Sequence, residues 1–213
     1  PLLEARKRLE RAEILRQSGD LVAAEKLCRE VLGRFPDYVA VLHTLGLVLA
    51  DKDQFAEALT YLVQATMLNP HDWRTLTALA GVYLKLNAQE MAARTLEQAQ
   101  AVKPEDATIL ATLGEVYRND REYEAAAEAY RKACAYDPTL LDAKSGLGHV
   151  CVHLGQLNEA AEAFSDLIRH RPNSLNLLYS ISQLPAGLVD VDVLELLDRV
   201  VPDGRQDPQA FEA

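Results

Sequence analysis

The sequence predicts an all-α solenoid in which five helical hairpins stack on one another and degenerate helices follow. Three observations support this prediction. A proline recurs every 34 residues, at Pro36, Pro70, Pro104, Pro138 and Pro172. An alanine recurs with the same period, at Ala24, Ala58, Ala92, Ala126 and Ala160. A glycine or alanine stands 12 residues before each of these alanines, at Ala12, Gly46, Ala80, Gly114 and Gly148. Such a period indicates units that bury their apolar faces only by stacking.

The period divides the chain into five units, whose 34 positions we number as columns. The units span 5–38, 39–72, 73–106, 107–140 and 141–174, and the proline occupies column 32. Columns 4, 7, 8 and 11 are mostly apolar or small and lie three or four apart, so they share one face of a first helix. Columns 20, 24 and 27 form the matching face of a second helix. Small residues at columns 8 and 20 let the two backbones approach closely, and larger residues fill the space around them.

The boundaries of each helix also recur. Gly19 and Gly155 at column 15 predict a left-handed turn between the two helices. The proline at column 32 ends the second helix, because the residue before a proline is disfavoured in the α region. Asp72, Asp106 and Ser174 then stand where the N-cap of the next first helix is expected.

Two units depart from the pattern. Arg8 and Arg11 occupy columns 4 and 7 of the first unit, so we expect its first helix to act partly as a polar cap. Lys144 occupies column 4 of the fifth unit, where its stem is expected to lie along the neighbouring helix with the ammonium in water. The first helix is basic, with Arg6, Lys7, Arg8, Arg11 and Arg16. The simpler interpretation is a solvated face, and the alternative is a docking site for an acidic partner or an anionic membrane.

Residues 175–213 lose the period and are predicted to form a degenerate sixth repeat and connecting helices. "NSLNLLYSISQL" predicts one further first helix that ends at Pro185. "VDVLELLDRVV" predicts a short amphipathic helix. In "DPQAFEA", Asp207 and Pro208 have the order of an N-cap and a first helical position. We therefore expect this chain to be a fragment of a longer protein.

The 34-residue period and its agreeing columns resemble the tetratricopeptide repeat (TPR) family over residues 5–174. The resemblance implies a right-handed superhelix whose first helices form a concave face that binds a peptide or protein segment. Carried over column by column, this face would hold His43, Leu47, Thr77, Gly81, Ala111, Glu115, Arg118, Ser145, His149 and Tyr179. Glu115 and His149 share a column in adjacent units, so we expect them to contact a common ligand.

Two subtypes of the family are disfavoured. Binders of chaperone tails resemble one another in a lysine at column 5 and an asparagine at column 9, a pair that is missing here. Solenoids of N-acetylglucosamine transferases carry an asparagine ladder, whereas column 6 here reads Glu10, Thr44, Ala78, Thr112, Gly146 and Ser180. The tail is similar to the region after the repeats of bacterial TPR–sulfotransferase fusions. This implies the alternative of a substrate-recruiting region whose catalytic domain lies beyond residue 213.

Composition narrows the partner and the compartment. A formal net charge of −10 argues against nucleic acid as the main partner. Three cysteines without a CxxC motif favour a reducing compartment, so a cytoplasmic location is expected. No apolar run approaches the roughly 18 residues of a membrane span. Usage rich in Ala, Leu and Arg is typical of a bacterial protein.

Few residues suggest chemistry. His149 and His153 have the spacing of a two-histidine metal site, but Val150 replaces the glutamate of a zinc-protease motif and no third ligand is evident. The GxG at Gly146 falls inside a predicted helix rather than after a strand. We therefore expect no catalytic residue, cofactor or metal, and a protein-interaction scaffold rather than an enzyme. Self-association through exposed solenoid ends is a further expectation.

Overall fold

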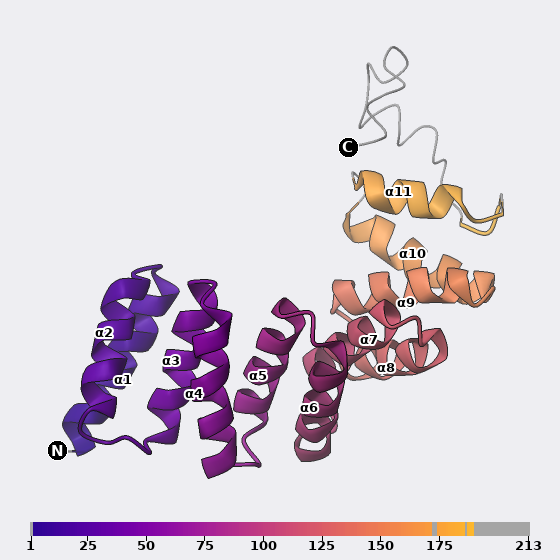
Figure 1. Cartoon of the computed structure of the whole chain (residues 1–213). Coiled ribbons are helices and arrows are strands. Elements are labelled where there is room, and N and C mark those ends of the chain that lie inside the picture. Colours follow the sequence, from indigo (N-terminus) through magenta and orange to yellow (C-terminus); the bar gives the residue numbers. More distant parts are fainter. Residues whose placement is uncertain (1, 172–173, 186, 190–213) are drawn as a thin grey trace. The chain divides into compact units, whose positions relative to one another are not determined.

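The computed structural model describes residues 2–171, 174–185 and 187–189, and all regular structure within them is helical (Figure 1). The prediction of an all-α fold is therefore confirmed. The amphipathic helix expected at 191–201 and the helix start expected at 207 lie outside the described residues, as does Pro172.

The helices alternate between first and second members of hairpins. The first helices are α1 (Leu2–Gln17), α3 (Val39–Asp51), α5 (Trp73–Lys85), α7 (Ala107–Asn119) and α9 (Leu141–His153). The second helices are α2 (Leu21–Leu32), α4 (Phe55–Leu68), α6 (Gln89–Val102), α8 (Tyr123–Tyr136) and α10 (Leu157–His170). A further short helix follows, α11 (Leu175–Ser182). Helices α4, α6 and α8 each end two residues before a recurring proline, as its backbone constraint requires.

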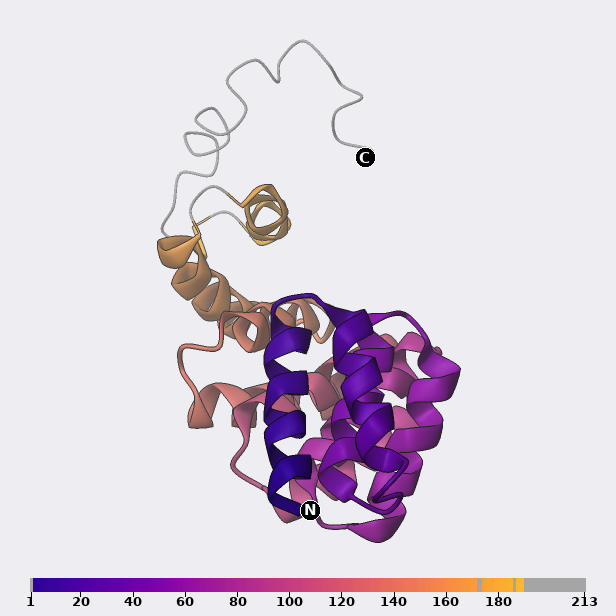
Figure 2. The same ribbon diagram turned by 90° about the vertical axis from the view of Figure 1, so that its left-hand side faces the viewer.

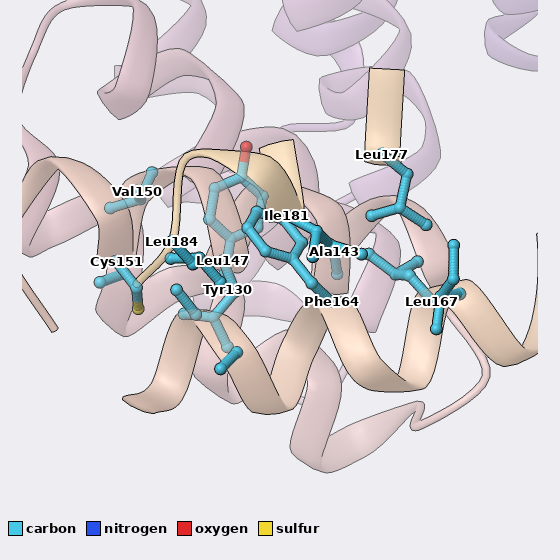
Figure 3. Packing of buried hydrophobic residues seen from close by; sticks show 14 of the residues in the cluster. Tyr130, Ala143, Leu147, Val150, Cys151, Phe164, Leu167, Leu177, Ile181 and Leu184 are labelled. Carbon is cyan, nitrogen blue, oxygen red and sulfur yellow. The ribbon is translucent and has the colours of Figure 1, made fainter. Parts of the chain in front are cut away.

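The contacts divide the chain into two units, residues 1–109 and 110–213, with the boundary inside α7. In the first unit, α1 packs on α2, α3 on α4 and α5 on α6, and successive hairpins meet through α2 on α3 and α4 on α5. In the second unit, α9 packs on both α8 and α10, and α10 packs on α11. Each unit has its own apolar core; Figure 3 shows that of the second.

Close helix packing depends on a small residue at column 8 opposite a large one at column 24. Gly46 lies against Leu62, Gly114 against Tyr130 and Gly148 against Phe164. A Cβ added to Gly148 would lie 2.4 Å from Cε1 of Phe164, which is far inside contact distance. The rings of Phe164 and Tyr130 both lie in the core shown in Figure 3.

The turn between the two helices of a hairpin has the same left-handed conformation in all five copies. The column 15 residues Gly19, Asp53, Asn87, Arg121 and Gly155 have φ of 86°, 58°, 59°, 63° and 71°. The next amide donates to the carbonyl of column 11 with a nitrogen–oxygen distance of 2.8 or 2.9 Å, which closes a Schellman motif. The two glycines predicted this turn. Asp53 and Asn87 belong to types that tolerate the left-handed conformation, whereas Arg121 adopts it against its intrinsic preference.

Two helix N-termini have the expected side-chain caps. Oδ1 of Asp72 accepts from the amide of Arg74, and Oδ1 of Asp106 accepts from the amides of Thr108 and Ile109. Ser174 occupies the N-cap of α11 without a side-chain capping bond.

The expectation for Lys144 is wrong. Its side chain is only 15% exposed and its ammonium pairs with Asp166 of α10, instead of remaining in water. The carboxylate of Asp166 compensates the burial of a cation at a column that holds leucine in the second, third and fourth units.

We predict opposite effects of alanine at two helical glycines. Gly148→Ala should destabilise the fold by about 1–3 kcal/mol because the new methyl group overlaps Phe164. Gly81→Ala should stabilise it by about 1 kcal/mol, because a Cβ there meets nothing within 4 Å and alanine favours the helix. Urea denaturation of both variants checks this, and equal shifts of the two midpoints would contradict the packing described.

Arg121→Gly should raise the free energy of unfolding by about 1 kcal/mol, because glycine adopts the left-handed conformation without steric cost. Lys132→Gly, an exposed position inside α8, is the matched control and should lower it by about 1 kcal/mol. Thermal denaturation of the two variants measures both, and a loss of stability in Arg121→Gly would show that the side chain makes an essential contact.

Candidate functional site

In the first unit, the expected inner-face residues lie on two helices that contact each other. His43 and Leu47 stand four apart on α3, and Thr77 and Gly81 four apart on α5, so each pair shares a helix face. Helices α3 and α5 pack directly together. The hydroxyl of Thr77 donates to the carbonyl of Trp73 at 2.8 Å, and is therefore engaged within its own helix.

His43 belongs to a chain of hydrogen bonds that links α3 to the start of α5. Nδ1 of His43 lies 3.1 Å from Oγ1 of Thr75, which lies 2.7 Å from Oδ2 of Asp72. The single hydroxyl proton of Thr75 is donated to the carboxylate, because a carboxylate only accepts. The hydroxyl oxygen therefore accepts from Nδ1–H of His43. This arrangement holds the neutral imidazole in one tautomer, with Nε2 as a hydrogen-bond acceptor.

Burial lowers the pKa of His43 below its ordinary value of 6.5, although the carboxylates of Asp72 and Glu13 oppose this effect. Arg16 and Arg74 lower the pKa further. At neutral pH, His43 is consequently uncharged. Among the described residues, none makes a hydrogen bond to its Nε2.

Gly81 leaves the backbone of α5 open on the same helix face as Thr77. The residue is exposed, and a Cβ there would have no heavy atom within 4 Å. A ligand can therefore approach this stretch of helix more closely than a side chain would allow.

In the second unit, α7 carries Ala111, Glu115 and Arg118. Ala111 and Arg118 are half-buried and Glu115 is exposed. The guanidinium of Arg118 lies 3.8 Å from the carboxylate of Glu115, a loose ion pair that leaves most of the carboxylate in solvent. Burial raises the pKa of the neighbouring Tyr130 to about 12, so its hydroxyl keeps its proton.

Both ring nitrogens of His149 are engaged inside the protein. Nδ1–H donates to the carbonyl of Ser145 at 2.7 Å, and Nε2 lies 3.0 Å from Oγ of Ser180 in α11. The ring also meets Phe164 edge-on at 5.4 Å. His149 therefore joins α9 to α11. Oγ of Ser180 also lies 2.8 Å from the carbonyl of Asn176, so its single proton is shared between that carbonyl and Nε2 of His149.

The structure thus separates the expected residues of the second unit by role. Ser145 and His149 support the packing of α11, whereas Glu115 and Tyr179 present exposed groups, with Tyr179 63% exposed. No hydrogen bond or ion pair among the described residues joins Glu115 to His149. Their sharing of one ligand stays a prediction.

Sequence reasoning missed Asp72 and Thr75 as partners of His43, and Ser180 as the partner of His149. Asp72 was identified only as a helix cap. These partners are adjacent in space but far apart in the sequence. Thr75 follows His43 by 32 residues, and Ser180 follows His149 by 31. A spacing close to the repeat period is the one feature that connects them.

The other candidate groups have structural environments. The ring of His153 stacks on Tyr123 with 4.6 Å between centroids. Within the described residues, no three His, Cys, Asp or Glu side chains are grouped as metal ligands would be. Burial raises the pKa of Cys28 to about 12 and of Cys151 to about 11, so both thiols stay protonated and are poor nucleophiles. The GxG at Gly146 lies inside α9.

A tetratricopeptide repeat family model matches residues 49–116 and 117–183, more than half of the chain. The chain therefore belongs to the tetratricopeptide repeat family. Repeats of this family generally mediate protein–protein interactions. No curated protein sequence matches the chain.

Several solved structures have a similar fold. MamA (residue 41 to the end) from Desulfovibrio magneticus RS-1 is 23% identical, with a TM-score of 0.72 over 80% of this chain and 97% of that chain. PilF of Pseudomonas aeruginosa is 18% identical, with a TM-score of 0.76 over 84% and 82%. YrrB, described as a TPR protein with an unusual peptide-binding site, is 18% identical, with a TM-score of 0.70 over 82% and 90%. At these identities the likeness shows the fold.

The resemblance of the tail to sulfotransferase fusions has no support from these comparisons, and stays a prediction about residues that are mostly outside the described part. No helix in the described part of the chain is long and apolar enough to cross a membrane.

The imidazole of His43 should titrate below pH 6.5, because burial disfavours its charged form. Asp72→Asn should lower the midpoint further, since the carboxylate favours the imidazolium, while asparagine still caps α5. NMR titration of the histidine ring protons measures both midpoints. A midpoint at or above 6.5 in the unaltered protein would contradict the burial of this ring.

Proposed function

We propose that this chain is a protein-interaction scaffold that binds a peptide or protein segment along the inner face of its first helices. The observation that carries the proposal is the oriented acceptor on His43. Its Nδ1–H is held by Thr75 and Asp72, and Nε2 has no partner among the described residues. An acceptor fixed in this way discriminates among ligands, because a ligand that lacks a donor leaves it unpaired.

The surroundings of His43 suit a peptide backbone. Amide N–H groups are donors for Nε2, and Gly81 of the contacting helix offers an open stretch for close approach. Leu47, half-buried one turn from His43, supplies apolar contact. Membership of a family that mediates protein–protein interactions and the fold shared with the peptide-binding protein YrrB support this function.

In the second unit we propose that Glu115, Arg118 and Tyr179 supply ligand contacts, with Ser145 and His149 as residues that position α11. Ala111 would act as a small spacer at the same column as Ser145. We also propose a reducing, cytoplasmic environment, supported by three cysteines that are free thiols, two of them buried.

The test is a selection of short random peptides that bind the unaltered protein, followed by affinity measurements on variants. Gly81→Tyr should weaken the selected peptides at least about tenfold by filling the inner face, and His43→Phe about fivefold by removing the acceptor. Gln98→Tyr, on an exposed position of the second helix α6, is the matched control and should leave affinity unchanged.

Circular dichroism of all three variants should match that of the unaltered protein, because Gly81 and Gln98 are exposed and phenylalanine replaces the ring of His43 with one of similar size. Selected peptides that bind Gly81→Tyr as tightly as the unaltered protein would exclude the inner face of the first unit from binding.

A further inference from the structure

One face of the first helix is buried in later hairpins but exposed in the N-terminal hairpin. In α3, α5 and α9, columns 3, 7 and 10 are no more than 8% exposed. These residues are Val41, Leu45, Val48, Thr75, Leu79, Val82, Ala143, Leu147 and Val150. The second helix of the preceding hairpin packs on each of these helices: α2 on α3, α4 on α5 and α8 on α9. Columns 3, 7 and 10 are therefore the seat of a helix.

In α1 the same three columns hold Lys7, Arg11 and Ile14. Lys7 and Arg11 are exposed, and Ile14 is 65% exposed. Leu3, one turn before Lys7, is 69% exposed. Two aliphatic side chains thus lie at the ends of a stripe with two cations between them. Figure 2 views the first unit from this side, with α1 and α2 facing the reader.

A groove between α1 and α2 adjoins this stripe and has a volume of about 570 Å³. The half-buried side chains of Leu15 and Leu27 line it together with Ala23. Lys7, Arg11 and Lys26 also line it. A fourth cation, Arg8, and three carboxylates, Glu4, Asp20 and Glu30, complete the lining. The groove therefore combines an apolar surface with charged side chains, the pattern that accepts one side of an amphipathic helix.

Three of the four cations that line the groove lack an ion-pair partner within the described part of the chain. Arg8 pairs with Glu4 and Glu30, both at 3.3 Å, and Asp20 accepts from the amide of Ala23. Lys7, Arg11 and Lys26 have no ion-pair partner within 4.0 Å among the described residues. This local excess of positive charge occurs in a chain whose formal net charge is −10.

In later hairpins, the helix that packs on these columns also forms ion pairs. Arg29 of α2 pairs with Glu57 of the following hairpin at 2.6 Å, and Arg131 of α8 pairs with Glu159 at 2.7 Å. A helix in the seat therefore covers the apolar columns and forms ion pairs with the hairpin that it packs on. At the N-terminal hairpin, Glu10 pairs with Arg6 at 3.2 Å, so the charges that complement Lys7, Arg11 and Lys26 are negative.

We propose that the outer face of the N-terminal hairpin, formed by Leu3, Lys7, Arg11, Ile14 and Lys26, docks an acidic amphipathic helix of a partner protein. The helix lies along α1 as α2 lies along α3. Its apolar residues cover Leu3 and Ile14, which are separated by about 16 Å along the helix axis. Its carboxylates meet Lys7, Arg11 and Lys26. This surface is separate from the inner face, and the inference does not depend on the function proposed above.

The probe is a stapled, fluorescently labelled amphipathic helix of about 18 residues with leucine on one face and glutamate on its flanks. Its counterpart has lysine at every glutamate position. The acidic probe should bind the 213-residue chain at least about tenfold tighter than the basic one, and more weakly as ionic strength rises.

Three variants locate the binding. Lys7→Glu combined with Arg11→Glu should weaken the acidic probe at least about tenfold. Lys85→Glu combined with Arg121→Glu makes the same change of charge at exposed cations that have no ion-pair partner in the described part of the chain, and should change affinity less than about twofold. Ile14→Ser keeps the charge and should weaken binding about fivefold, which separates helix docking from non-specific attraction.

Equal affinity for the acidic and basic probes, or no effect of the Lys7 and Arg11 reversals, would overturn the proposal. Sedimentation of the chain alone and flotation with phosphatidylserine vesicles test the other occupants. Self-association, or vesicle binding, that the Lys7 and Arg11 reversals abolish would assign this face to a second copy or to a membrane instead. Gly81→Tyr should leave binding of the acidic probe unchanged, which distinguishes this face from the inner one.

Discussion

The contact between a glycine on the first helix and a large residue on the second helix is the constraint on which three of the hairpins depend. Gly46 against Leu62 and Gly148 against Phe164 bring two helix backbones closer than a Cβ would permit. The large side chain fills the space that the glycine leaves, so both members are needed for close packing. The second helix of the preceding hairpin packs on α3, α5 and α9, which couples hairpin geometry to stacking.

Stacking at a fixed period also places polar side chains of neighbouring hairpins together. His43 meets Thr75 across 32 residues, and His149 meets Ser180 across 31. The two histidines nevertheless differ in what they leave available. The bonds of His43 use one ring nitrogen and orient the other as an acceptor, whereas those of His149 use both. The same repeat register therefore produces a candidate ligand contact in one unit and a structural contact in the other.

Much of the fold was predictable because the same residue types recur at the same columns of five repeats. Gly19 and Gly155 revealed the left-handed turn. Asp53 and Asn87 are of types that tolerate it, but the identity of Arg121 gives no sign of it. The burial of Lys144 was missed because its partner, Asp166, lies on another helix. No sequence pattern connects the two positions. The repeat columns were enough to list the positions of the candidate site. The hydrogen bonds of the structure were needed to tell which side chains are exposed and which are bonded within the protein.

The most direct test of a scaffold that binds through its first helices is a map of amide chemical-shift changes when a selected peptide is added to the isotopically labelled chain. The account predicts changes concentrated on α3 and α5, including the amides of His43 and Gly81, with the exposed face of α6 unaffected. Changes confined to second helices, with α3 and α5 unperturbed, would contradict it.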